Sequence, residues 1–350
     1  MDRLAHGELV ESKLSKAEGA LSGTPFATII LKYVEIMNTI SLSLAQRGSS
    51  FWKKVKQQKI LILMSVPFLI HIIIFKYVPI WGWLMAFQNY WPGKGILEQT
   101  WVGLENFKLL FEDVVFYEVL RNTLAMSIIK LVMGTVSSIV LALMLNEVRR
   151  IRFKKAAQTI SYLPHFISWV VAANLVRDAV STDGGIVNRV LMNLHIISEP
   201  IMFLGIPKLF WWVIGVSHVW KEVGWGAIIY LAAIAGIDPA LYESAMIDGA
   251  GRLKQIWYIT LPSIRPTISI LLIMNMGYLM SSGFEQQYLL QNGRVIDYAR
   301  VFTIYELDYG IKMMRYSFAT AVGIFRSVVS LILVFGTNQL AKRWGQERLV

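Results

Sequence analysis

Long apolar blocks constrain this chain of 350 residues more than any other feature of its sequence. A helix needs about 20 mostly apolar residues to cross the hydrocarbon core of a bilayer. Only 16% of the residues are charged, whereas soluble domains carry about 25%. We therefore predict an all-α, polytopic membrane protein with six transmembrane helices, which cover roughly residues 60–87, 120–145, 160–180, 209–237, 266–290 and 317–340.

The first apolar block begins too far along the chain, and is too long, to be a cleaved signal peptide. Before it, apolar residues recur at helical spacing between Phe26 and Leu44. This pattern predicts an amphipathic helix that lies on the membrane or on a partner, and a loosely held extension is the alternative. We accordingly divide the chain into a cytoplasmic extension, residues 1–50, and a membrane domain, residues 51–350.

The net charge of +11 is concentrated in segments that six spans would place on one side of the membrane. Lys and Arg gather on the cytoplasmic side of membrane proteins, so we expect both termini there. The loop after the fifth span, with Arg294 and Arg300, is a mild exception. Because topology explains the charge, we do not expect nucleic acid as a partner. The basic segments contain Lys53, Lys54, Lys56 and Lys59, then Arg149, Arg150, Arg152, Lys154 and Lys155, and finally Lys342, Arg343 and Arg348.

Sequence signatures of enzymes are missing. The chain has no phosphate-binding G-x-x-x-x-G-K-[ST] loop, no H-E-x-x-H and no G-x-S-x-G. His218 and Glu222 could share a helix face, but this pair lacks a third metal ligand, and the absence of cysteine excludes thiolate sites. We therefore predict no catalytic residue, no metal site and no cofactor bound by this chain.

The loop between the fourth and fifth spans is predicted to contain two short helices, residues 240–247 and 253–259. Asp238 followed by Pro239 is a typical helix start, and Gly249 permits a sharp turn. Pro262 ends the second helix. The small and apolar residues of this loop would be exposed unless a partner docks on them, although an ordinary linker packed on its own bundle is an equally good interpretation.

The same loop resembles the EAA motif, E-A-A-x-x-x-G followed by I-x-L-P, of the permeases of binding-protein-dependent ABC importers. Glu243, Ser244 and Ala245 stand for E-A-A, Gly249 is the glycine, and residues 259–262 close the motif. The only departure is Ser244, where a small residue replaces another. The resemblance implies a type I ABC importer permease, in which the loop 237–265 docks on the ATPase subunit.

The resemblance carries a coupling role over to the first half of the loop. The residues that it assigns to coupling with the ATPase are Asp238, Tyr242, Glu243, Ser244, Ala245, Met246, Asp248, Gly249 and Ala250.

Sequence outside the loop resembles the carbohydrate branch of these permeases, in particular those for complex or acidic oligosaccharides. The similar stretches are KEVGWGAIIYLAAIAGIDPALYESAMIDGA, FEQQYLL and YSFATAVGIFRSVVSLILV. The resemblance implies an oligosaccharide substrate and a place in the bacterial plasma membrane. It implies as partners a second, homologous permease, two ATPase subunits that hold ATP and Mg²⁺, and an extracellular or periplasmic solute-binding protein.

Polar side chains within the spans indicate where a substrate path could run, because lipid cannot solvate them. Amides and hydroxyls beside aromatic rings suit a sugar. Hydrogen bonding between helices explains each of them equally well. Other polar residues in the spans, such as Lys130, Arg177, Asp178 and Arg326, carry no assignment. The candidates for the path are Asn174, Trp220, Lys221, Glu222, Asn275, Tyr278, Ser282, Glu285 and Gln286.

Three other functions stay open at this point. A secondary transporter driven by an ion gradient would explain charge within six spans, but such proteins usually show internal repeats, and the sequence has none. An ABC importer for a solute other than sugar would share the EAA motif. A membrane-embedded enzyme would need a catalytic set that the sequence does not assemble.

Overall fold

The computed structural model describes residues 57–343 with the exception of residue 282. The amphipathic helix predicted before residue 50 lies outside these residues. The chain divides into two compact units, Met1–Trp81 and Gly82–Val350. Helices dominate the described part, where the strands are a single antiparallel pair, β1 (Gln88–Asn89) and β2 (Thr100–Trp101).

The first unit contains the start of the first predicted span. Helix α3 (Lys59–Ile72) continues into a π-helical turn, Ile73–Tyr77, and a 3-10 segment, Val78–Phe87, which reaches into the second unit. Together these 29 residues are long and apolar enough to cross a membrane. Apolar residues lie on every side of α3, which is typical of a helix that is solvated by lipid or by other membrane helices.

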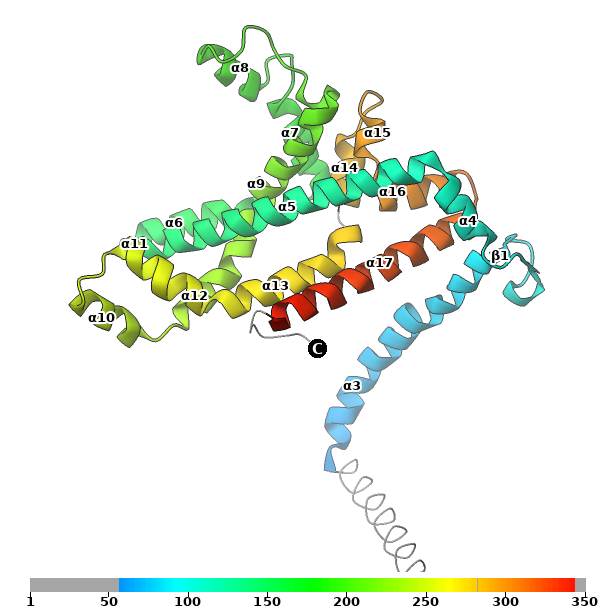
Figure 1. Ribbon diagram of the computed structural model, residues 1–350, viewed down its shortest axis with the longest axis horizontal. Helices are drawn as coiled ribbons and strands as arrows, with labels where there is room; N and C mark the ends of the chain where they lie inside the picture. Colours follow the sequence, from blue (N-terminus) through cyan, green and yellow to red (C-terminus); the bar gives the residue numbers. More distant parts are fainter. Residues whose placement is uncertain (1–56, 282, 344–350) are drawn as a thin grey trace, which may run out of the picture. The chain divides into compact units, whose positions relative to one another are not determined.

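Two long helices, α5 (Val114–Glu147) and α9 (Pro207–Ala235), lie side by side and form the most extensive helix contact of the second unit (Figure 1). Small residues let them approach closely, as in many membrane bundles. A Cβ atom added to Gly226 would lie only 2.4 Å from Oγ of Ser138, and this hydroxyl donates to the carbonyl of Val223 at 3.4 Å.

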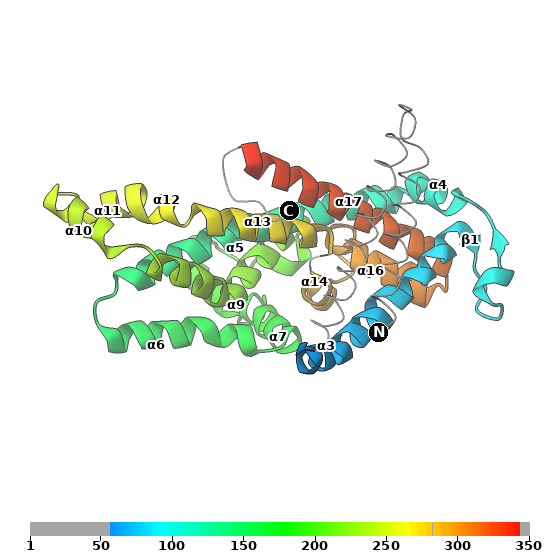
Figure 2. The ribbon, with the colours of Figure 1, turned by 90° about the horizontal axis from the view of Figure 1, so that it is seen from below.

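A second pair, α13 (Arg265–Tyr278) and α17 (Tyr316–Arg343), packs alongside (Figures 1 and 2). Aromatic rings fill the core between α17, the short helix α4 (Glu105–Glu112) and the first turns of α5. Phe116 makes edge-on contacts with Phe111 and Phe325, with ring centroids 5.5 and 5.1 Å apart. These contacts hold the N-terminal end of α5 against α17.

Helix α5 contacts two short helices, α15 (Ile296–Ala299) and α16 (Phe302–Leu307). Asp113 caps α5 by accepting from the amide of Val115 at 3.0 Å, and its carboxylate also accepts from the hydroxyls of Tyr305 and Tyr309. Burial, reinforced by the hydrogen bond to Asp113, raises the pKa of both tyrosines, so both hydroxyls stay protonated donors. Other short elements of the second unit are α8 (Ile186–Asn193), the 3-10 turn Phe203–Gly205, α14 (Phe284–Leu290) and the π turn Asp308–Lys312.

The third predicted span, residues 160–180, is a bent pair of helices rather than one continuous helix. Helix α6 (Ile151–Tyr162) leads into a 3-10 turn, Leu163–Phe166, and α7 (Trp169–Ala179) leaves at an angle of 105°. Pro164 cannot donate to the helical ladder, and Ser168 caps the new helix by accepting from the amide of Val171.

The fifth predicted span, residues 266–290, is also interrupted. Helix α13 ends in a 3-10 turn, Leu279–Ser281, and Gly283 has φ of +99°, a left-handed conformation that ends one helix before α14 begins. Within the described residues, three helices suffice alone to cross a membrane, and the number rises to as many as six if each bent pair is one span. The predicted number of spans agrees with that upper value.

Contact between the backbone of α6 and α9 depends on Gly224. A Cβ atom at this position would lie 2.0 Å from the carbonyl oxygen of Ser161. We expect Gly224→Ala to destabilise the purified chain by about 1–3 kcal/mol, because overpacking against a backbone cannot be relieved by a rotamer change. The thermal midpoint in detergent measures this effect. In Gly336→Ala of α17, the added Cβ has no neighbour within 4 Å, and an unchanged or slightly raised midpoint is expected, because alanine favours a helix over glycine. Equal losses in both variants would contradict the packing argument.

Candidate functional site

A projecting pair of short helices carries the EAA-like residues. Helix α10 (Pro239–Ile247) is followed by α11 (Arg252–Gln255), a π turn, Ile256–Thr260, and α12 (Leu261–Ser263). We call residues 238–263 the knob. It lies at the left end of the bundle in both Figure 1 and Figure 2. The first helix that the sequence predicted here, residues 240–247, is confirmed within one residue at each end. The second begins at Arg252, one residue before its predicted start, but it does not end before Pro262, because helical turns continue to Ser263.

The knob begins and turns as its residues predict. The carboxylate of Asp238 accepts from the amide of Ala240 at 2.9 Å, with Pro239 in the first turn. Gly249 ends α10 with φ of +73°, and the amide of Ala250 donates to the carbonyl of Ala245 at 2.8 Å.

Two side-chain contacts hold the knob together and to the bundle. The hydroxyl of Tyr242 lies 2.9 Å from Oγ1 of Thr260, which ties α10 to the π turn. The guanidinium of Arg252 lies 3.7 Å from the carboxylate of Glu147 at the end of α5. The second contact is largely solvent-exposed and therefore weak.

The outer surface of the knob is apolar and uncovered. No residue of α10 is buried, and Ile247 is 87% exposed, while Tyr258 on the π turn is 80% exposed. Glu243, Met246 and Asp248 are exposed on the same projection, and Ser244 only donates to the carbonyl of Ala240. An exposed apolar surface with a few charges is typical of a docking site.

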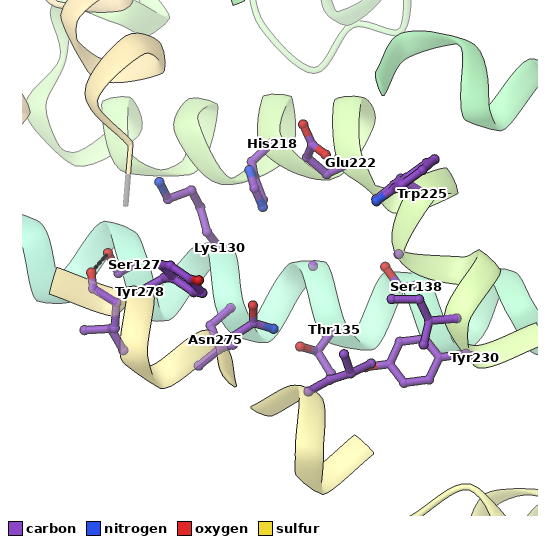
Figure 3. A pocket seen from close by; sticks show the side chains of 16 residues that line it. Ser127, Lys130, Thr135, Ser138, His218, Glu222, Trp225, Tyr230, Asn275 and Tyr278 are labelled. Atoms are coloured by element: carbon purple, nitrogen blue, oxygen red, sulfur yellow. Dashed lines mark hydrogen bonds between the residues drawn. The ribbon is translucent and has the colours of Figure 1, made fainter. Parts of the chain in front are cut away.

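A cavity of about 330 Å³ lies between α5, α9 and α13 (Figure 3). This volume falls in the range of small-molecule sites. Aromatic, hydroxyl, amide and charged groups point into it from all three helices. The polar and aromatic side chains that line it are Ser127, Lys130, Thr135, Ser138, His218, Glu222, Trp225, Tyr230, Asn275 and Tyr278.

Only some of the residues that the sequence predicted for the substrate path line this cavity. Glu222, Asn275 and Tyr278 line the cavity together. Gln286 does not; it is buried and donates to the carbonyl of Ile214 at 2.8 Å and to Ser217, so it joins α14 to α9.

The remaining candidates lie elsewhere. Trp220 faces a separate apolar cavity of about 660 Å³ between α7 and α9. Asn174 is exposed and accepts from the guanidinium of Arg177 at 3.3 Å. Glu285 is exposed, and Ser282 lies outside the described residues.

The ammonium group of Lys221 is hydrogen-bonded within the chain. It is 5% exposed, and its ammonium donates to the carbonyl of His165 at 2.9 Å and to the carboxylate of Glu222 at 3.1 Å. Glu222 also lies 2.7 Å from Nδ1 of His165, whose ring stacks on Trp225 with centroids 4.5 Å apart. The carbonyl of His165 belongs to the 3-10 break before α7, so Lys221 satisfies backbone that a continuous helix would have bonded itself.

Several cavity residues were missed by the sequence argument. Ser127, Lys130, Thr135 and Ser138 of α5 follow one another at helical spacing and share one face of an otherwise apolar span. This polar stripe is visible in the sequence and predicts a face turned away from lipid.

The hydrogen bond within the knob predicts a local effect of Tyr242→Phe. Loss of the contact with Thr260 removes about 1 kcal/mol, so amide hydrogens of α10 should exchange faster. Hydrogen exchange followed by mass spectrometry measures this. Tyr258→Phe is the matched control, because Tyr258 is highly exposed and forms no hydrogen bond with the described part of the chain. Equal exchange in both variants and in the wild type would show that the contact does not hold the knob.

Comparison with known proteins gives one consistent set of relatives. The family described as "Binding-protein-dependent transport system inner membrane component" matches residues 114–346. Protein LplB of Bacillus subtilis is 42% identical over 87% of this chain and 95% of its own length. The polygalacturonan/rhamnogalacturonan transport system permease protein YteP of the same organism is 45% identical over 84% of this chain and 91% of its own.

A solved structure shares the fold. A chain of a bacterial alginate ABC transporter, in complex with an alginate pentasaccharide-bound periplasmic protein, superimposes with a TM-score of 0.78 at 40% identity. The superposition covers 85% of this chain and 99% of that chain.

Proposed function

Because this chain belongs to the family of inner membrane components of binding-protein-dependent transport systems, we propose that it forms half of the membrane path of an ATP-driven oligosaccharide importer. Membership in this family argues against an ion-coupled secondary transporter. A sugar is the substrate, as the names of its relatives support, and those names point to sugars with acidic groups. Thr135, Asn275 and Tyr278 of the cavity offer the hydroxyl, amide and aromatic groups that a sugar requires.

The partners follow from the knob and from the sequence. This chain has no phosphate-binding loop, so ATP and Mg²⁺ belong to two ATPase subunits, one of which docks on the knob. A second permease completes the path, and a solute-binding protein delivers the sugar from outside. The basic segments support a cytoplasmic position for both termini and for the knob, in the bacterial plasma membrane.

One observation carries this function: the knob is continuous with two of the three helices that line the cavity. It follows α9 directly after Gly236, and it leads through α12 into α13. A force on α10 therefore acts on α9 and α13 at once. Closure of the ATPase pair would shift these helices against α5 and open the cavity to alternate sides of the membrane.

Gly249→Asp tests docking on the knob. A Cβ atom at Gly249 has no neighbour of this chain within 4 Å, so the added carboxylate would meet the ATPase rather than the permease itself. In proteoliposomes that hold the complete importer, we expect ATP-driven uptake to fall at least about tenfold, the equivalent of 1.4 kcal/mol of coupling. Gly184→Asp is the control, because Gly184 has φ of +72° and equally open surroundings, but lies far from the knob in the sequence. Wild-type uptake with Gly249→Asp would contradict the docking site.

Glu243→Lys tests the charge of the knob. The side chain is exposed and forms no ion pair with the described residues, so reversal should leave the fold intact while it repels a cationic surface of the ATPase. We expect the ATPase activity of the complex to lose its stimulation by sugar-loaded binding protein, at unchanged complex yield. Ser244→Ala, which removes only a hydroxyl bonded to the carbonyl of Ala240, should keep full stimulation. Retained stimulation in Glu243→Lys would refute a coupling role for this residue.

A further inference from the structure

Lys130 is a buried cation without a partner. It lies within α5, is 4% exposed, and its ammonium forms no hydrogen bond or ion pair with any residue that the structure describes. A charged group within a membrane span is costly unless an opposite charge or water compensates it. The group that compensates Lys130 therefore comes from outside this part of the chain.

The side chain of Lys130 lines the cavity between α5, α9 and α13. Figure 3 shows its amino end directed away from α5, toward α9 and His218. A Cβ atom at Gly134, one turn further along α5, would lie 3.8 Å from the ring of His218, so this glycine leaves room for the ring beside the lysine. The cation thus borders open space and not the packed interior of the bundle.

The single carboxylate among the cavity-lining residues is already occupied. Glu222 accepts from Lys221 at 3.1 Å and lies 2.7 Å from His165, so the charges of Glu222 and Lys221 compensate each other. Lys130 is left as the uncompensated positive charge of the cavity. Such a site favours an anionic ligand over a neutral one.

Neutral groups that line the same cavity as Lys130 indicate the rest of the ligand. The side chains of Thr135, Asn275 and Tyr278 line the cavity and form no hydrogen bond with the described residues. They can therefore bind hydroxyls, and the ring of Tyr278 can cover a pyranose face. A carboxylate together with several hydroxyls on one ring is the chemistry of a uronic acid.

We propose that Lys130 determines specificity for acidic sugars, by binding the carboxylate of a uronic acid unit as the oligosaccharide passes the cavity. This inference rests on the proposed function as a sugar importer, and it names the substrate class and the residue that selects it.

The test uses the complete importer, this chain with its partner permease, ATPases and binding protein, in proteoliposomes. The probes are trigalacturonate, a trimer of mannuronate, and maltotriose as a neutral trisaccharide. With an acidic probe that the wild type imports, Lys130→Met should lower uptake about tenfold or more, because a charge-assisted hydrogen bond is lost. Lys130→Arg, which keeps the charge, should stay within about threefold of the wild type.

A second readout separates a role in the path from a structural role. Stimulation of ATP hydrolysis by loaded binding protein depends on the surface that contacts the binding protein and on the knob that contacts the ATPase. Lys130 lies in neither, so Lys130→Met should retain the stimulation while uptake falls. Lys208→Met removes a positive charge from an exposed position at the start of α9, outside the cavity, and should change neither quantity.

Several results would overturn the inference. They include uptake of an acidic probe by Lys130→Met at the wild-type rate, or joint loss of uptake and stimulation. Failure of both Lys130→Met and Lys130→Gln to assemble with the second permease would mean that Lys130 pairs with that subunit. Wild-type import of maltotriose alone would refute acidic specificity while leaving an importer, whereas import of none of the probes would refute the proposed function itself.

Discussion

The inability of a hydrocarbon environment to solvate polar groups shapes this structure more than any other constraint. Buried polar side chains of the long helices therefore mostly bond other polar groups, and Lys130, which has no such partner among the described residues, is the exception. Asn122 in α5 donates to the carbonyls of Asp297 and Arg300 at 2.8 and 3.1 Å. Gln286 binds α9 in the same way, as described above. These contacts connect segments far apart in sequence and fix how the helices are rotated about their axes.

The same constraint explains why the helices can break where they do. Backbone groups freed by a break inside a membrane protein need new partners. At the break after α6, the carbonyl of His165 accepts from Lys221, whose charge is balanced by Glu222. Lys221, predicted as a path residue, does not line the cavity, and in the structure it makes this structural contact. Glu222 has both a structural contact and a place in the cavity wall, because it bonds Lys221 and also lines the cavity.

The knob and the cavity form one mechanical unit through α9 and α13. A rigid turn at Gly249 and the contact between Tyr242 and Thr260 keep the knob compact, so that displacement at its surface is passed to the helices rather than lost within the loop. The cavity lies where those two helices meet α5. Movement of α9 and α13 therefore changes the surroundings of Lys130 without any change in α5 itself.

The sequence by itself determined the apolar spans, the start of α10 at Asp238 and the turn at Gly249, because each depends on neighbouring residues alone. It did not reveal the breaks at residues 163–168 and 279–283 or the separation of Trp220 and Gln286 from the cavity. Helical periodicity tells which residues share a face, but not whether that face meets lipid, another helix or open space. Only the packing of α5, α9 and α13 decided that question, since it depends on contacts between residues distant in the chain.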